Sequence, residues 1–215
     1  MHCKKKISFL LSLMFIIGAC AGIEKPRNKI DFYTLEYDPP MQAGLSPLPV
    51  VIRLQRFSVA PDYNTNRIIY RDRSFRRNSY VYHKWRANPG DLVAHFLGRD
   101  MIRSGLFKAV LAHDSGSSAS YLLEGSINEF LERDLDERWE AVLSLDITLM
   151  RGNEPDASKR ILFQKTYRED EPCRRRNPRA LAEAMSGAMA EISKKIIEDV
   201  YAETRHNGKH NPNNH

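Results

Sequence analysis

The segment RWEAVLSLDITLM, residues 138–150, decides the fold class because two sets of side chains alternate along it. One set, which runs at every second position from Trp139 to Leu149, is entirely apolar, whereas the other includes Glu140, Ser144 and Asp146. A period of two predicts a β-strand that buries one face in a core. The flanking segments YLLEGSINEFLER (121–133) and RILFQKTYRE (160–169) are predicted to be strands as well. With turns at DLDE and RGNEPDASK, the three segments predict a meander of long strands.

Five further strands and two helices are predicted around this meander. The strands are DFYTLEY (31–37), PVVIRLQRFSVA (49–60), RIIYR (67–71), SYVYHK (79–84) and LFKAVLA (106–112). The first helix runs from Pro89 to Ser104, with Gly105 at its C-cap. Its apolar face is formed by residues at helical spacing, namely Leu92, Val93, Phe96, Leu97, Met101 and Ile102. Phe96 and Met101 are expected to lie on the sheet, with Arg99 on the opposite face. The second is a long C-terminal helix that follows Asn177-Pro178. This order predicts an α/β (α+β) fold, a three-layer domain in which two main helices flank a mixed, largely antiparallel sheet.

The first 19 residues have the layout of a bacterial secretory signal. Lys4, Lys5 and Lys6 precede the apolar run ISFLLSLMFII (7–17), and the small residues Gly18 and Ala19 follow it. This run is shorter than the roughly 17 to 25 apolar residues that a membrane-spanning helix needs. Residues 1–19 are therefore predicted to be a signal peptide that is removed.

The residue after this signal is a cysteine, and Ile17-Gly18-Ala19-Cys20 resembles the lipobox of bacterial lipoproteins. The resemblance implies cleavage before Cys20 and covalent attachment of lipid to it, whereas the alternative is a chance cysteine at the end of an ordinary signal. Two or more acyl chains suffice for stable membrane anchoring. Ala21, at the position where Asp retains enterobacterial lipoproteins in the inner membrane, implies the outer membrane. The predicted organisation is thus a lipidated tether at 20–29, a domain at 30–205 and a disordered polar tail at 206–215.

Composition fits one exported domain. Removal of residues 1–19 takes three lysines and no acidic residue, so the formal charge falls from +6 to +3. Once Cys20 carries lipid, Cys173 has no cysteine to pair with inside the mature chain. It is expected to be a free, unreactive thiol, and an intermolecular or metal-binding role is the alternative.

The sequence contains no catalytic or metal-binding constellation that we regard as credible. His113-Asp114-Ser115 has the residue types of a triad, but adjacent residues on a loop cannot converge on one another. His83 and His95 lack a partner at metal-ligand spacing, and no glycine-rich phosphate loop occurs. We therefore expect no enzyme activity, no metal and no cofactor other than the lipid on Cys20.

Two arginine-rich clusters remain. Arg71, Arg73, Arg76 and Arg77 lie in the predicted turn between two strands, and Arg174, Arg175, Arg176 and Arg179 precede the last helix. The turn is either an ordinary solvated surface or a contact for anionic lipid headgroups or an acidic partner protein. Export from the cytoplasm argues against nucleic acid as the partner.

Taken together, several segments resemble the ABC-type transport auxiliary lipoprotein family, the group similar to paraquat-inducible protein C. The matching text is the lipobox, FYTLEY, VVIRLQRFSVAPDYNTNRIIYRD, SYVYHKWRANPGDLVAHFLGRDMIRSGLFKAV, YLLEGSINEF and ALAEAMSGAMAEISKKI. The most specific part is the tryptophan, the proline and the helix that ends in Ser104-Gly105 before Phe107. The usual pattern has Ala after the tryptophan and often a second Pro, whereas this chain has Arg86 and Asn88-Pro89-Gly90.

The resemblance implies a non-catalytic accessory lipoprotein of transporters built around mammalian-cell-entry (MCE) domain proteins, which move phospholipid or other apolar cargo between two membranes. The implied partners are the MCE-domain protein and the ABC transporter components, with phospholipid as a candidate cargo. The implied location is the cell envelope, on the periplasmic side of the outer membrane. A structural or assembly lipoprotein associated with peptidoglycan is the alternative, and a homo-oligomer stays open.

Overall fold

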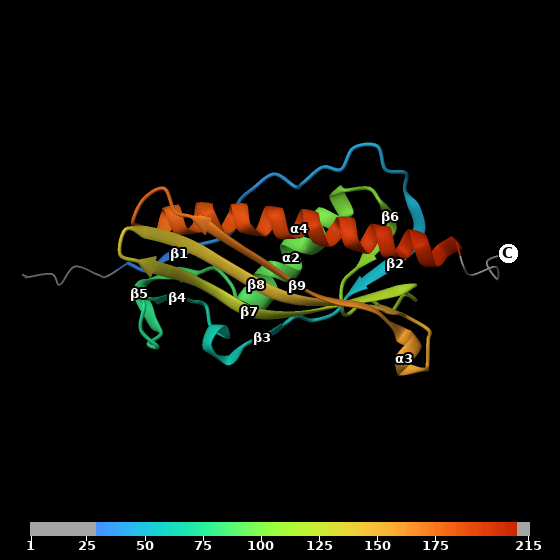
Figure 1. The fold of residues 1–215 in the computed structure, drawn as a ribbon, viewed down its shortest axis with the longest axis horizontal. Coiled ribbons are helices and arrows are strands. Elements are labelled where there is room, and N and C mark those ends of the chain that lie inside the picture. The colour runs from blue at the N-terminus through green and yellow to red at the C-terminus, as the bar shows by residue number, and fades with distance from the viewer. Residues whose placement is uncertain (1–28, 210–215) are drawn as a thin grey trace, which may run out of the picture.

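The computed structural model describes residues 29–209, which form an α+β domain around a curled mixed sheet (Figure 1). The strands are β1 (Asp31–Tyr33), β2 (Leu48–Leu54), β3 (Ser58–Val59), β4 (Arg67–Arg71), β5 (Asn78–Trp85), β6 (Phe107–Leu111), β7 (Tyr121–Leu135), β8 (Arg138–Arg151) and β9 (Ile161–Pro172). The helices are η2 (Pro61–Tyr63), α2 (Pro89–Arg103), α3 (Ala157–Arg160) and α4 (Pro178–Lys209). The predicted fold class is confirmed.

The meander forms as predicted, because β7, β8 and β9 pair antiparallel along most of their length. On β8 the alternate residues Ala141, Leu143, Leu145, Ile147 and Leu149 are fully buried. The neighbouring face of β8 is not purely polar, because Val142 is also fully buried there. The meander contains the three longest described strands of the sheet, and α4 packs on β8 and β9.

One edge of β7 pairs with β8. Along its other edge, β7 pairs in succession with β2, β3 and β4, and each of these pairings is parallel. Strand β6 then pairs parallel with β2, while β5 pairs antiparallel with β4 and carries β1 at the outer edge. The strand predicted at 49–60 is therefore broken at Gln55–Phe57. The break lets the Phe57 ring cover Gly125, where a Cβ atom would lie only 2.3 Å from the Phe57 Cε2 atom.

Both main helices pack on the same face of the sheet. On α2, a Cβ atom at Gly98 would lie 3.6 Å from Leu54 of β2. On α4, the Asp199 carboxylate accepts a 2.6 Å hydrogen bond from the Tyr167 hydroxyl of β9. The two helices also contact each other, so the centre of the domain has two layers and not the predicted three. Curling of the sheet makes one face concave enough to cover both helices, and Figure 1 shows α4 along the length of the molecule.

Helix α2 begins at Pro89, as predicted, after the Asn88 side chain accepts a hydrogen bond from the Gly90 amide. Phe96 and Met101 are buried, at 8% and 1% exposure. Two expectations for this helix were wrong. Ile102, placed among the apolar residues of the core face, is 60% exposed. Arg99, placed on the opposite face, forms a 2.7 Å ion pair with the fully buried Asp100.

The predicted strand at 31–37 ends at Tyr33 because the next residues turn to the helices instead of pairing. The Glu36 amide donates to the Ser186 hydroxyl of α4, and the Tyr37 hydroxyl donates to the Asp100 carboxylate of α2 at 2.7 Å. The segment after β1 therefore ties the two helices together.

The ends of the chain fall largely outside the described residues. The signal peptide, Cys20 and all but the last residue of the predicted tether belong to that part. At the other end, α4 continues to Lys209, so the tail predicted from position 206 begins as helix. In the described part of the chain, no helix has the length and apolar character that crossing a membrane requires.

Candidate functional site

A groove of about 520 Å³ lies between α2 and the ends of β2 and β6. Its apolar lining comes from all three elements and includes Leu54, Phe57, Ala94, Ile102, Val110 and Leu111. The small residues Ala94 and Gly98 stand one helical turn apart on α2 and leave the space that larger side chains would fill. The volume is in the range of ligand pockets, about 300 to 1,000 Å³. We call this feature the α2–β6 groove.

The polar residues around the α2–β6 groove are mainly basic. Three arginines and two histidines line it with a single carboxylate, and these residues are Arg56, Arg99, Arg103, His95, His113 and Asp91. The Arg56 Nη2 atom lies 3.2 Å from the His113 Nε2 atom, which holds the two groups together at the ends of β2 and β6. An apolar lining with a basic rim favours ligands that combine apolar and anionic parts.

Arg99 connects this groove to the core. Its guanidinium lies 4.4 Å from the centre of the Tyr37 ring and 4.7 Å from that of Phe96. Its charge is balanced by Asp100, which also accepts from the Tyr37 hydroxyl. Burial, and then the hydrogen bond to Asp100, raise the pKa of the Tyr37 hydroxyl above its ordinary value. Arg99 thus belongs to a structural ion pair with Asp100. The other two arginines of the groove, Arg56 and Arg103, have no carboxylate partner among residues 29–209.

The structure brings the four predicted arginines together at the β4–β5 hairpin but neutralises most of their charge. Arg71 pairs with Glu129 at 3.5 Å, Arg73 with Asp136 at 3.1 Å, and Arg76 with Asp72 at 3.6 Å. Arg77 donates to the Phe75 carbonyl oxygen at 3.4 Å. The hairpin, which we define as residues 71–77, is therefore less basic than its sequence indicates.

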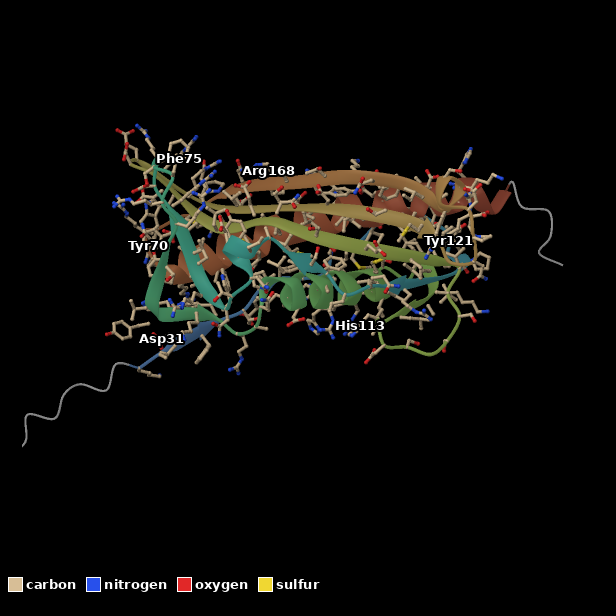
Figure 2. All side chains as sticks on the ribbon, turned by 90° about the horizontal axis from the view of Figure 1, so that it is seen from below. Asp31, Tyr70, Phe75, His113, Tyr121 and Arg168 are labelled. Carbon is tan, nitrogen blue, oxygen red and sulfur yellow. The ribbon has the colours of Figure 1, made fainter. Side chains whose placement is uncertain are left out.

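The tip of the hairpin carries an exposed aromatic residue that no local sequence pattern indicates. Phe75 is fully exposed, at 104% of its reference area, next to Arg73, Arg76 and Arg77. Figure 2 shows Phe75 and Asp31 at the same end of the long axis, with His113 near the middle and Tyr121 toward the other end. The hairpin thus shares one end of the domain with the start of the described chain.

The residues considered as catalytic or metal-binding groups in the sequence do not form such a site in the described part of the chain. His113 and Asp114 are exposed, Ser115 is partly buried, and His113 contacts Arg56. The Tyr33 hydroxyl lies 3.3 Å from His83 Nδ1, and the His95 ring packs against Phe96. In the part of the chain that the structure describes, no three His, Cys, Asp or Glu side chains come together as metal ligands would.

The second arginine cluster and Cys173 also lie in defined contacts. Arg176 pairs with Asp134 at 2.5 Å and lies over the Trp139 ring, and Arg179 pairs with Glu183 at 3.2 Å. Cys173 is half-buried and has no disulfide partner within residues 29–209. Burial raises the pKa of its thiol to about 12, so the thiol stays protonated near neutral pH.

The groove could not be predicted from the sequence, because its residues come from three separate segments. One local signal was present: Met101 and Ile102 are adjacent on a helix and point about 100° apart, so both cannot face the same core. The stripe of Ala94, Gly98 and Ile102, at four-residue spacing, would have indicated a second, shallow apolar face.

The comparisons with known proteins identify the class. The model of the ABC-type transport auxiliary lipoprotein component family matches residues 33–197, which is most of the described domain. The chain therefore belongs to this family of auxiliary lipoprotein components of ABC-type transport. None of the curated proteins matches the chain.

Solved structures show the same fold at low sequence identity. Protein XCC0632 from Xanthomonas campestris, of the DUF330 family, is 15% identical, with a TM-score of 0.74 over 83% of this chain and 99% of that one. An uncharacterized protein is 11% identical, with a TM-score of 0.63 over 80% and 99%. The hypothetical protein CT253 from Chlamydia trachomatis is 8% identical, with a TM-score of 0.51 over 73% and 98%.

Proposed function

We propose that this chain is a non-catalytic accessory lipoprotein of an intermembrane lipid transport system that combines an MCE-domain protein with an ABC transporter. The observation that carries the proposal is the family match over residues 33–197. The α2–β6 groove supports it, because an apolar groove is a surface on which cargo or a partner can bind. Phospholipid is the candidate cargo.

In this proposal, lipid on Cys20 anchors the mature chain in the outer membrane with its domain in the periplasm. The supporting observations are the lipobox resemblance and Ala21 at the sorting position. Eleven peptide steps separate Cys20 from Asp31, so even a fully extended chain spans at most roughly 40 Å. That reach keeps the end of the domain that carries β1 near the membrane.

The hairpin at residues 71–77 then contacts anionic headgroups, with Arg73, Arg76 and Arg77 around Phe75. Its position at the same end as Asp31 supports this orientation (Figure 2). An exposed aromatic ring beside basic side chains suits the interfacial region of a bilayer. Arg71 contributes less, because its side chain is only 25% exposed, whereas those of Arg73 and Arg76 are 70% and 76% exposed.

The proposed contact for the MCE-domain partner is the outer edge of β1. Among the described strands, β1 pairs only with β5, which leaves its other edge available for an added strand. Phe32 on this strand is 51% exposed. The alternative, a structural or assembly lipoprotein bound to peptidoglycan, requires neither this edge nor an apolar groove.

Affinity purification of the full lipidated chain from bacterial envelopes tests the function. The MCE-domain protein and the ATPase subunit should be recovered with it in several mild detergents. A Cys20→Ser variant, whose hydroxyl is a much weaker nucleophile for lipid attachment, should lose labelled palmitate and recover less of both. Recovery of peptidoglycan or assembly proteins, with no transporter component, would instead establish the structural alternative.

A further inference from the structure

We propose that the α2–β6 groove binds an amphiphile with an aliphatic chain and a phosphate or carboxylate head. The inference rests on the proposed role in lipid transport and assigns a site in this chain to the cargo. Of the described surface features, this groove combines an apolar lining with basic groups that lack carboxylate partners.

The aliphatic chain lies along the helix. Ala94 and Gly98 present almost no side-chain volume toward the groove, and Ile102 continues the same stripe at the next turn. Ile102 is 60% exposed, an unfavourable position for a large apolar side chain unless something covers it. On the strand side, Leu54 and Val110 continue the apolar lining, and Leu54 lies directly beneath Gly98, 3.6 Å from the position of a Cβ atom there. A chain placed in the groove would therefore contact apolar atoms of the helix and of the strands.

The anionic head lies where β2 and β6 end. These strands are parallel, and therefore Arg56 and His113, which follow them, lie together beside the first turns of α2. Arg56 donates toward His113 at 3.2 Å and still has further N–H groups for a phosphate or carboxylate oxygen. Asp91 is the carboxylate of the groove, and its charge is offset by the adjacent helix N-terminus.

Arg103 marks the other end of the groove, one turn beyond Arg99. Among residues 29–209 the lining has three arginines against one carboxylate, and this excess of positive charge disfavours a cationic occupant. The apolar part of the lining disfavours an acidic occupant that has no apolar portion. A neutral apolar chain alone would leave Arg56 at the groove without a counter-charge. An amphiphile can contact the apolar lining with its aliphatic chain and the basic groups with its anionic head.

Site-specific photo-crosslinking in bacterial cells tests this assignment on the full, lipidated chain. A photo-reactive amino acid replaces Ile102 at the groove or, as a matched control, Ile161, which is 52% exposed on β9 and does not line the groove. Mass spectrometry of the irradiated protein then measures added mass. We expect a lipid adduct at position 102 well above that at 161, and its mass distinguishes a phospholipid from a fatty acid.

Two second-site variants separate the groove from general membrane contact. Gly98→Leu puts a larger side chain into the groove and should abolish the adduct. A Cβ atom at this position already makes an ordinary 3.6 Å contact with Leu54, so a thermal melt of the variant checks that it is folded. Arg56→Gln should lower the adduct about tenfold, as expected for loss of one charge-assisted hydrogen bond, whereas Arg205→Gln on the exposed side of α4 should not.

Three results would overturn the inference: equal lipid adducts at positions 102 and 161, adducts that neither Gly98→Leu nor Arg56→Gln lowers, or crosslinks at 102 to protein alone. Any of these would leave the recovery of transporter components from envelopes unchanged. Failure of the groove assignment is therefore distinguishable from failure of the proposed function.

Discussion

At the scale of single residues, Glu132 is the most unusual group in the domain. It is 1% exposed on β7, and the Tyr80 hydroxyl lies 3.1 Å from both of its carboxylate oxygens. Burial raises the pKa of this carboxyl to about 7, and the hydrogen bond from Tyr80 only partly opposes the shift. Ionisation of Glu132 in the folded state therefore costs free energy.

Because the pKa of Glu132 is raised in the folded chain, we expect the free energy of unfolding to depend on pH. As pH rises from about 4 to about 8, the unfolded chain loses the Glu132 proton before the folded chain does, so the free energy of unfolding falls by up to about 3 kcal/mol. Glu132→Gln should remove this fall, stabilising the protein near pH 8 and changing little near pH 4. Denaturant titrations at a series of pH values measure the free energy of unfolding of the parent and of the variant. A difference between variant and parent that does not change with pH would contradict this expectation.

Arg99 shows what residue-level reasoning from sequence cannot supply. Its position on the helix indicated solvent, because helical period specifies an angle and not the neighbours at that angle. The structure places Tyr37, from a segment far away in sequence, against it. The buried Asp100 was equally hidden, since nothing local indicates that a carboxylate will meet its partners in the core.

At the scale of elements, helix α2 owes its position to Phe96. This side chain is 8% exposed and packs on the Tyr37 ring at 5.5 Å between centres. Phe96→Ala should lower the free energy of unfolding by roughly 3 to 5 kcal/mol through lost burial and a cavity. Ile102→Ala on the same helix is 60% exposed and should cost less than about 0.5 kcal/mol. Thermal or denaturant melts in which the two variants behave alike would show the opposite helical face in the core.

The hairpin at residues 71–77 gives a second prediction at this scale. An environment-sensitive dye on a cysteine at position 75 of the lipidated chain should shift to an apolar signal in vesicles with anionic lipid. Arg73→Glu, Arg76→Glu and Arg77→Glu together should reduce the shift. Cys173 should label slowly, because its thiol pKa is about 12.

The control for this measurement is a dye at position 41, where Met41 is 76% exposed on the long loop before β2. A dye at position 41 should show no lipid-dependent shift. Equal shifts at positions 41 and 75 would mean that the hairpin does not face the membrane.

The elements with a strong period were predictable, and those defined by distant contacts were not. The strand at 138–150 was indicated by the alternation of its own residues, and the helix after Asn88 by its own cap and spacing. Both predictions are confirmed. The break between β2 and β3 follows from Phe57 packing on Gly125, two positions that only the folded chain brings together. The end of the strand at Tyr33 likewise depends on hydrogen bonds to α2 and α4.

At the scale of the whole molecule, the sheet is built on β7. Its one edge supports the meander and its other edge holds β2, β3 and β4 in parallel pairings that no local pattern specifies. Curling of this sheet gathers both helices on one face and leaves the α2–β6 groove at their margin. The domain therefore offers three separate surfaces: the groove, the β1 edge, and the hairpin near the chain entry.

These surfaces suit the proposed role as an anchored accessory subunit, and the decisive measurement is lipid transfer in a reconstituted system. Labelled phospholipid would be followed between vesicles that carry the purified MCE-domain and ABC transporter components, with and without the lipidated chain and with ATP present. Transfer should be faster when the chain is present, and the Gly98→Leu chain should give no gain. Transfer at the same rate with and without the chain would contradict the proposed role.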